Sequence, residues 1–94
     1  MMSKNYFVYI LWSAFHKRFY IGVTDDVKRR LDQHNAGISK WTRGRGPWVI
    51  VWQRLFSSLS EARRFENRLK KQKGGNKFFE HAGLDPAEFR LPGS

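Results

Sequence analysis

Three apolar runs are the first regular feature of the chain. Residues 6–12 read YFVYILW, residues 18–24 read RFYIGVT, and residues 48–56 read WVIVWQRLF. Aromatic and β-branched residues dominate the runs, and such residues favour β-strands. The polar stretch SAFHK separates the first two runs and is short enough for a hairpin connection. The pattern therefore predicts a hairpin followed, later in the chain, by a third strand.

A helix is predicted at residues 26–35, between the second and third runs. Three residues recur there at helical spacing and define an inward stripe: Val27, Leu31 and His34. Thr24 or Asp25 can cap the start of this helix. Gly37 is placed to end it, because glycine readily adopts the left-handed conformation that follows many helices.

A second helix is predicted after the third run. Ser58 and Glu61 have the spacing of a capping box, in which each side chain satisfies a backbone N–H of the first turn. An apolar stripe then marks one side of the segment: Ala62, Phe65 and Leu69. Gly74 and Gly75 follow the last stripe residue closely, so the helix should end before them.

The whole pattern predicts an α+β fold in the order β-β-α-β-α-α, with a small three-stranded sheet flanked by helices. Residues 76–82 supply the last helix, and Asp85-Pro86 can start a final turn. One face of the sheet would remain available to a ligand. Ninety-four residues suit one domain, 1–94, with a core at about 6–80 and a tail at about 83–94.

Charge narrows the class of partner. Lys and Arg outnumber Asp and Glu by 18 to 8, which gives a net charge of +10. Such a surface attracts polyanions, so nucleic acid is the leading partner, although membrane-surface binders and merely soluble proteins can also be basic. Cysteine is absent, which excludes disulfides, thiol chemistry and zinc ribbons. With no secretory signal or membrane span in the sequence, we expect a cytoplasmic protein that does not bind membranes.

The second run carries two different faces if it is a strand. Its odd positions, Phe19, Ile21 and Val23, form an apolar face suited to the core. Tyr20 and Gly22 share the other face, and a strand glycine often marks a close approach by a ligand or another backbone. A half-buried tyrosine beside a bulge glycine is the alternative interpretation. Tyr9 would join this face only in one register of the hairpin.

Three polar residues lie on or beside the apolar stripes of the helices. Arg30 falls between Val27 and His34, where a guanidinium requires an anionic partner. A histidine such as His34, taken alone, is more often a satisfied side chain at a helix end than a catalyst. Glu66 lies inside the stripe of the second helix, so its carboxylate should bind a metal or form a salt bridge with Arg30 or a lysine.

Together these residues resemble the GIY-YIG nuclease family. Tyr20-Ile21-Gly22 matches the second motif, and Val8-Tyr9-Ile10 stands for the first, with valine in place of glycine and Tyr9 in the middle position on a loose reading. The family's helical arginine falls on Arg30, its histidine on His34 and its metal-binding glutamate on Glu66. The stretches HNAG at 34–37 and KWTRGRGPW at 40–48 are similar to the short stand-alone members. The resemblance covers residues 6 to about 80.

The resemblance implies hydrolysis of a DNA phosphodiester with one divalent ion, Mg²⁺ or another divalent cation. Glu66 would hold the ion, and Arg30 would meet the charge that gathers on the phosphoryl group. Tyr9 or Tyr20 would orient or deprotonate the attacking water, and His34 could share that role. Many members also place an asparagine after the glutamate helix, for which Asn76 is the candidate.

Substrate binding is expected from a basic loop and a basic helix. The loop residues offer phosphate contacts beside an exposed ring: Lys40, Trp41, Thr42, Arg43 and Arg45. The helix adds a basic face, for which a solvated surface is the alternative: Arg63, Arg64, Arg68, Lys70, Lys71 and Lys73. Such contacts hold a nucleic-acid backbone without reading bases. Trp48 and Trp52 are expected to pack in the core or on the sheet.

Three functions remain open at the level of sequence. The leading one is an endonuclease or nicking enzyme acting on branched, damaged or single-stranded DNA, as in repair or recombination. The second is a nucleic-acid binding module that keeps the nuclease fold without turnover. The third is a protein-interaction domain. Because the family normally carries a separate DNA-targeting domain and no residues remain for one here, a protein partner could supply targeting.

Overall fold

The computed structural model describes residues 5–73 and 75–89 and has the predicted α+β architecture. Three strands, β1 (Tyr6–Ser13), β2 (Arg18–Thr24) and β3 (Val49–Phe56), form one antiparallel sheet in the order β2-β1-β3. The helices are α1 (Val27–Asn35), α2 (Leu59–Gln72) and α3 (Asn76–Ala82), followed by a 3₁₀ turn, η1 (Pro86–Glu88). The predicted element order is confirmed.

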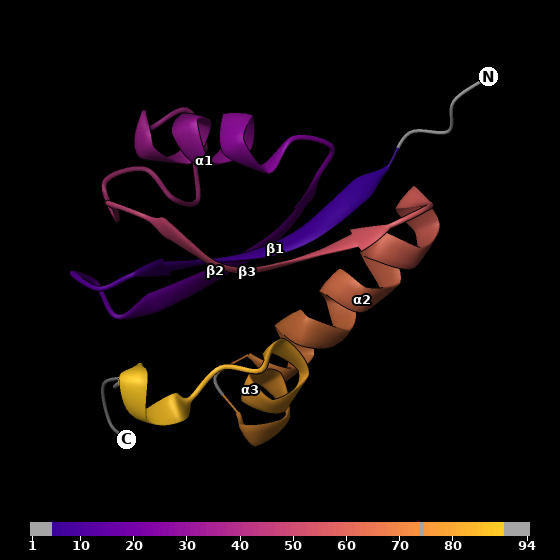
Figure 1. The fold of residues 1–94 in the computed structure, drawn as a ribbon. Helices are drawn as coiled ribbons and strands as arrows, with labels where there is room; N and C mark the ends of the chain where they lie inside the picture. The colour runs from indigo at the N-terminus through magenta and orange to yellow at the C-terminus, as the bar shows by residue number, and fades with distance from the viewer. Residues whose placement is uncertain (1–4, 74, 90–94) are drawn as a thin grey trace.

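The sheet is a central layer between unequal helical layers. Figure 1 shows α1 on one face of the sheet, while α2, α3 and the 3₁₀ turn lie on the other. The larger core lies on the α2 side and joins alternate strand residues to aromatic side chains of α3 and of the segment after it: Val8, Ile10, Trp12, Phe19, Ile21, Phe78, Phe79 and Phe89. The smaller core lies under α1 and includes Tyr9, Leu11, Val27 and Trp48. Both faces of the sheet are therefore covered, but the core on the α1 side contains fewer residues than the core on the α2 side.

Strand register decides which side chains face α1. In the β1–β2 hairpin Tyr9 pairs with Gly22, and Leu11 pairs with Tyr20. Side chains alternate across a strand, so Tyr9, Tyr20 and Gly22 share the α1 face. Phe19 and Ile21 belong to the opposite core, as the sequence predicted. The sequence did not decide the hairpin register. The observed register brings Tyr9 and Tyr20 to the same face of the sheet.

The helix ends differ slightly from the predictions. The cap of α1 is Asp26, whose carboxylate accepts the N–H of Arg29 at 3.0 Å, rather than Thr24 or Asp25. The Thr24 hydroxyl instead contacts the backbone of Asp26, because Thr24 lies two residues before the cap and does not reach the free N–H groups of the first turn. Gly37, with φ of +78°, follows the helix as expected. Ser58 caps α2 by accepting the N–H of Glu61 at 3.2 Å.

In the part of the chain that the structure describes, no helix has the length and apolar character needed to cross a bilayer.

Candidate active site

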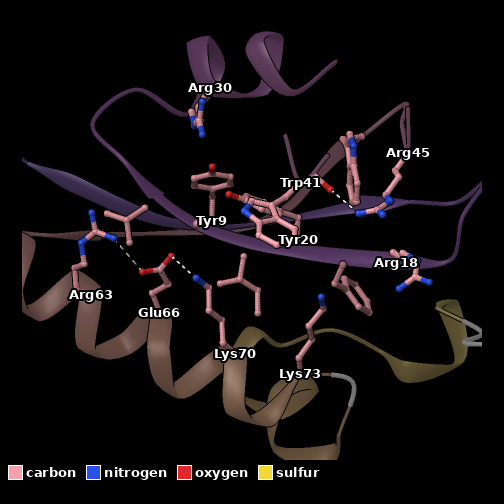
Figure 2. Close-up of a pocket in the computed structure, with 15 residues that line it drawn as sticks. Tyr9, Arg18, Tyr20, Arg30, Trp41, Arg45, Arg63, Glu66, Lys70 and Lys73 are labelled. Carbon is pink, nitrogen blue, oxygen red and sulfur yellow. Dashed lines mark hydrogen bonds and ion pairs between the residues drawn. The ribbon is translucent and has the colours of Figure 1, made fainter. Parts of the chain in front are cut away.

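A pocket of about 690 Å³ opens at the β2 edge of the sheet. Because β2 is an outer strand, residues from both of its faces line the pocket, together with residues of α1, α2 and the loop between α1 and β3. Figure 2 shows the polar and charged side chains that line it: Tyr9, Arg18, Tyr20, Arg30, Arg45, Arg63, Glu66, Lys70 and Lys73. Six of these nine are cationic and one is acidic, so the pocket favours an anion.

Tyr9 and His34 form a buried polar pair at the base of this pocket. The Tyr9 hydroxyl lies 2.9 Å from Nε2 of His34, and the two side chains are only 1% exposed. One residue comes from the central strand and the other from the last turn of α1. The contact therefore joins the helix to the sheet.

Thr42 contacts the second ring nitrogen of His34 and bears on which of the two carries the proton. The Thr42 hydroxyl lies 2.7 Å from Nδ1 of His34 and donates to the carbonyl of Ser39 at 3.5 Å. A hydroxyl has one proton, and if that proton is directed at the Ser39 carbonyl, the hydroxyl oxygen accepts from Nδ1–H. We infer that Nε2 is then the free acceptor and that the Tyr9 phenol donates to it. The sequence predicted Thr42 as a nucleic-acid contact, but its hydroxyl is buried behind the pocket.

Both members of the pair are neutral at rest. Burial lowers the pKa of His34 to about 4, and the charge of Arg30 adds to the shift. Burial also raises the pKa of the Tyr9 phenol above its ordinary value, and the nearby Tyr20 raises it further, whereas the Arg30 guanidinium opposes the rise. A phenolate does not form before substrate binds, so Tyr9 is suited to relay a proton rather than to act as a preformed anion.

Gly22 makes room for the Tyr9 ring. A Cβ atom added at Gly22 would lie 2.5 Å from the Tyr9 hydroxyl oxygen and 2.7 Å from Cζ. Both distances are far below van der Waals contact, so any side chain here would displace the phenol. The absence of a side chain at Gly22 is therefore needed for the observed position of the Tyr9 ring. The group that lies close to this glycine is a side chain of the same protein and not a ligand.

Tyr20 lines the pocket without belonging to the hydrogen-bonded pair. Its ring centroid lies 4.6 Å from that of His34 and 6.2 Å from that of Tyr9. The side chain is half-buried, and within the described residues its hydroxyl has no hydrogen bond. Tyr20 therefore packs against the pair while leaving its hydroxyl available to the pocket.

Arg30 and Glu66 lie on opposite sides of Tyr9 in Figure 2. Arg30 is half-buried in α1 and donates to the side-chain oxygen of Gln33 at 2.9 Å. Glu66 is 5% exposed and makes ion pairs with Lys70 at 3.1 Å and Arg63 at 3.6 Å. The salt bridge to a lysine that the sequence allowed is thus present, whereas the one to Arg30 is not formed.

The basic loop divides into pocket and non-pocket residues. Trp41 is 70% exposed and lines the pocket with Arg45, whose guanidinium donates to the Trp41 carbonyl at 2.9 Å. Arg43 instead donates to the carbonyl of Gly37 at 2.8 Å, which holds the loop together. Lys40 is exposed but does not line the pocket. Of the five loop residues predicted to bind nucleic acid, the pocket therefore includes Trp41 and Arg45.

The basic residues of α2 also divide into those that line the pocket and those that do not. Arg63, Lys70 and Lys73 line the pocket with Glu66, while Arg64 and Arg68 line a separate, smaller hollow beside Phe65. Helical periodicity accounts for the split, since positions 63, 66, 70 and 73 follow one face of the helix. The predicted basic face thus consists of an inner half at the pocket and an outer half away from it.

Sequence reasoning missed two contributors to this region. Arg18, the first residue of β2, lines the pocket, and its alternation with Tyr20 and Gly22 was a signal for this placement. Asn35 accepts the N–H of Trp48 at 2.7 Å and donates to its carbonyl at 3.1 Å, which ties the end of α1 to the start of β3. Asn76, the candidate for the family asparagine, is exposed at the start of α3 and does not line the pocket.

The strands, helices and pocket described above lie within a recognised family of domains. The model of the GIY-YIG catalytic domain matches residues 5–78, and the chain belongs to this family. It is also 44% identical over 70 residues to a UPF0213 protein of Staphylococcus haemolyticus, which covers 73% of this chain and 83% of that protein. A UPF0213 protein of Nitratidesulfovibrio vulgaris is 40% identical over 71 residues, covering 74% of this chain and 64% of that protein.

A solved structure is also similar. The solution NMR structure of a UPF0213 protein from Bacillus halodurans shares 33% identity with this chain, with a TM-score of 0.49, and covers 96% of this chain and 99% of that one. The names of these relatives state no activity. Membership of the GIY-YIG family indicates a nuclease-type domain, and the reaction must be argued from the pocket.

Proposed function

We propose that this protein is a metal-dependent endonuclease that hydrolyses phosphodiester bonds in DNA. The observation that carries the proposal is the gathering of the Tyr9–His34 pair, Arg30 and Glu66 around one cationic pocket. A water-activating group, a cation for the phosphoryl charge and a carboxylate for a metal are the parts that phosphodiester hydrolysis requires. The basic walls suit a nucleic-acid backbone, and the proposal includes both cutting and nicking of structured DNA.

Glu66 fits a single magnesium ion. Mg²⁺ commonly binds through one or two carboxylates, several waters and a substrate phosphate, so one acidic side chain in a phosphate-binding pocket is sufficient. In residues 5–73 and 75–89 no group of three His, Cys, Asp or Glu side chains could form a closed metal site. When bound, the ion would neutralise a phosphate oxygen and the leaving oxygen. Lys70 and Arg63, the present partners of Glu66, would have to share or release the carboxylate.

Tyr9 and His34 would carry the proton of the attacking water. As the water oxygen bonds to phosphorus, the Tyr9 oxygen accepts one water proton and passes its own proton to Nε2 of His34. His34 becomes an imidazolium whose Nδ1–H still donates to Thr42. The broken P–O bond leaves an alkoxide oxygen that takes a proton from solvent. The direction of the Tyr9 hydrogen bond supports Tyr9, rather than Tyr20, as the residue that contacts the water.

Arg30 would couple substrate binding to the basicity of His34. Its charge contributes to the low pKa of the imidazole in the free protein. A phosphate paired with the guanidinium would offset that charge, so His34 would become a stronger base once the substrate is in place. Arg30 would also stabilise the charge that accumulates on the phosphoryl oxygens during attack.

The test uses supercoiled plasmid and branched DNA with the intact protein. We expect cleavage in Mg²⁺, none in chelator, and a loss of at least about 100-fold in Glu66→Gln, because the carboxylamide cannot balance a divalent charge. Glu61→Gln is the matched control, since Glu61 lies on the same helix but is exposed and outside the pocket.

Two results would overturn the proposal. Cleavage that persists in Glu66→Gln or in chelator would remove Glu66 and the metal from the mechanism. Binding of every DNA substrate without cleavage would identify a nucleic-acid binding module that has kept the nuclease fold.

A further inference from the structure

A second cationic group lies in the pocket away from Tyr9 and Glu66. Arg18 and Lys73 line the same pocket, and Figure 2 places both on the opposite side of the picture from Arg63 and Glu66. Arg18 begins β2, and Lys73 directly follows the last residue of α2. Two elements that are far apart in sequence thus bring an arginine and a lysine to one end of a single hollow.

The spacing separates this group from the proposed position of the scissile phosphate. Arg18 precedes Gly22, the partner of Tyr9, by four residues, or about 13 Å along a strand. Lys73 follows Glu66 by seven residues, or about 10 Å along a helix axis. Successive phosphates of one strand of B-DNA advance about 3.4 Å along the helix axis, so the two positions correspond to phosphates a few nucleotides apart.

These two cations lack an anionic partner within the described residues. The one carboxylate of the pocket, Glu66, pairs with Arg63 and Lys70, and neither Arg18 nor Lys73 forms an ion pair in residues 5–73 and 75–89. Burial lowers the pKa of Lys73, and the neighbouring charges of Arg18 and Lys70 lower it further. Uncompensated charges this close repel one another, and a bound anion would relieve that repulsion.

We propose that Arg18 and Lys73 form a second phosphate subsite, which holds the nucleic-acid backbone a few nucleotides from the bond that is cut. The proposal rests on the proposed function, because that function places the scissile phosphate between Arg30 and Glu66. The subsite would fix the direction in which the substrate strand crosses the pocket, along β2 from Tyr9 toward Arg18. It would position the substrate without touching the reacting atoms.

The first test measures DNA binding without cleavage. A fluorescein-labelled branched DNA is titrated in chelator with wild-type protein and with Arg18→Ala/Lys73→Ala, at several salt concentrations between about 50 and about 200 mM. We expect at least about a 10-fold loss of affinity at the lowest salt and a salt slope reduced by about 1, which is the signature of one lost phosphate contact.

The matched control removes the same charge from the outer face of α2. Arg64→Ala/Arg68→Ala also lowers the net charge by two, but both residues line the hollow beside Phe65 instead of the pocket. We expect this variant to bind within about threefold of wild type, with an unchanged salt slope. Equal losses in the two double variants would overturn the subsite, because bulk charge alone would then explain the binding. Thermal unfolding of both variants checks that each is folded.

A second test changes the DNA and compares the wild-type protein with the same double variant. Single phosphates of the branched DNA are replaced in turn by uncharged methylphosphonates, and affinity is measured in chelator. Wild-type protein should lose affinity at two positions a few nucleotides apart, and Arg18→Ala/Lys73→Ala should be insensitive at one of them. One sensitive position in the wild type, or the same two positions in the variant, would contradict the proposal.

Failure of the subsite and failure of the proposed function give different results. Both subsite tests measure binding in chelator, so they can succeed in a protein that never cleaves DNA. Conversely, cleavage that depends on Glu66 but is unaffected by Arg18→Ala/Lys73→Ala at limiting DNA would preserve the nuclease and exclude the subsite. If DNA affinity did not depend on which phosphate is replaced, binding would reflect general charge attraction. That result would likewise exclude the subsite.

Discussion

The phenol of Tyr9 and the imidazole of His34, 25 residues apart in sequence, are joined by a buried hydrogen bond of 2.9 Å. This contact links the central strand to the last turn of α1. With Nδ1–H of His34 donating to Thr42, as inferred above, the phenol is the donor in this bond. One contact therefore serves both the packing of α1 and the proposed proton relay.

Replacement of each tyrosine by phenylalanine separates the two candidates for water activation. Tyr9→Phe keeps the ring and removes the proton that reaches His34, so we expect cleavage to fall about 10²–10⁴-fold, the usual contribution of general acid–base catalysis. Tyr20→Phe should cost less than about 10-fold, because the Tyr20 hydroxyl is not bonded to His34. Single-turnover experiments measure the cleavage rates of both variants. A larger loss in Tyr20→Phe than in Tyr9→Phe would assign water activation to Tyr20.

Thr42→Val should disturb the site without touching its surface. The variant keeps the volume of the side chain and leaves Nδ1–H of His34 buried without an acceptor, at a cost of about 1–3 kcal/mol. Thr42→Ser keeps the hydroxyl and is the matched control. We expect Thr42→Val, but not Thr42→Ser, to change the imidazole nitrogen shifts in NMR spectra and to slow cleavage. Identical imidazole shifts in the two variants would show that Thr42 does not set the tautomer.

The buried imidazole should make folding stability depend on pH. The pKa of His34 is about 4 in the folded state and about 6.5 when unfolded, so between these values the unfolded chain binds the extra proton. Stability contributed by neutral His34 is therefore complete above pH 6.5 and is lost as pH falls toward 4, by about 3 kcal/mol in total.

Urea unfolding at a series of pH values tests this dependence in wild type and in His34→Gln. Other titrating groups are common to both proteins, so the difference between their stability curves isolates His34. We expect the wild type to lose more stability than the variant below pH 6.5. Parallel curves would mean that His34 does not carry a depressed pKa.

The sequence predicted the fold well because periodicity is a local signal. The three apolar runs became β1, β2 and β3, and Gly37 and Gly75 follow the helices that they were expected to end, while Gly74 lies outside the described residues. The observed helix cap lies one residue after Asp25 and two after Thr24, since all three residues are suitable types and only backbone geometry selects Asp26.

The site was predictable only where its residues depart from a stripe or follow a motif. Glu66 and Arg30 interrupt helical faces, and both line the pocket. The roles of Thr42 and Arg43 depend on how the loop folds back on α1, which no periodic pattern encodes. The sequence predicted a close approach at Gly22 by a ligand or another backbone. The group that approaches is the phenol of Tyr9, and only the strand register reveals it.

Gly22→Ala is the most selective test of that close approach. The added methyl would lie 2.5 Å from the Tyr9 oxygen, so the phenol must move, at a cost of about 1–3 kcal/mol. Gly83→Ala is the control: its φ of +64° makes alanine unfavourable by about 1 kcal/mol, but the new atom meets nothing within 4 Å. We expect both variants to lose stability in urea and only Gly22→Ala to shift the His34 nitrogen resonances and slow cleavage. Normal resonances and cleavage in Gly22→Ala would show that the Tyr9–His34 contact survives without the space that glycine provides.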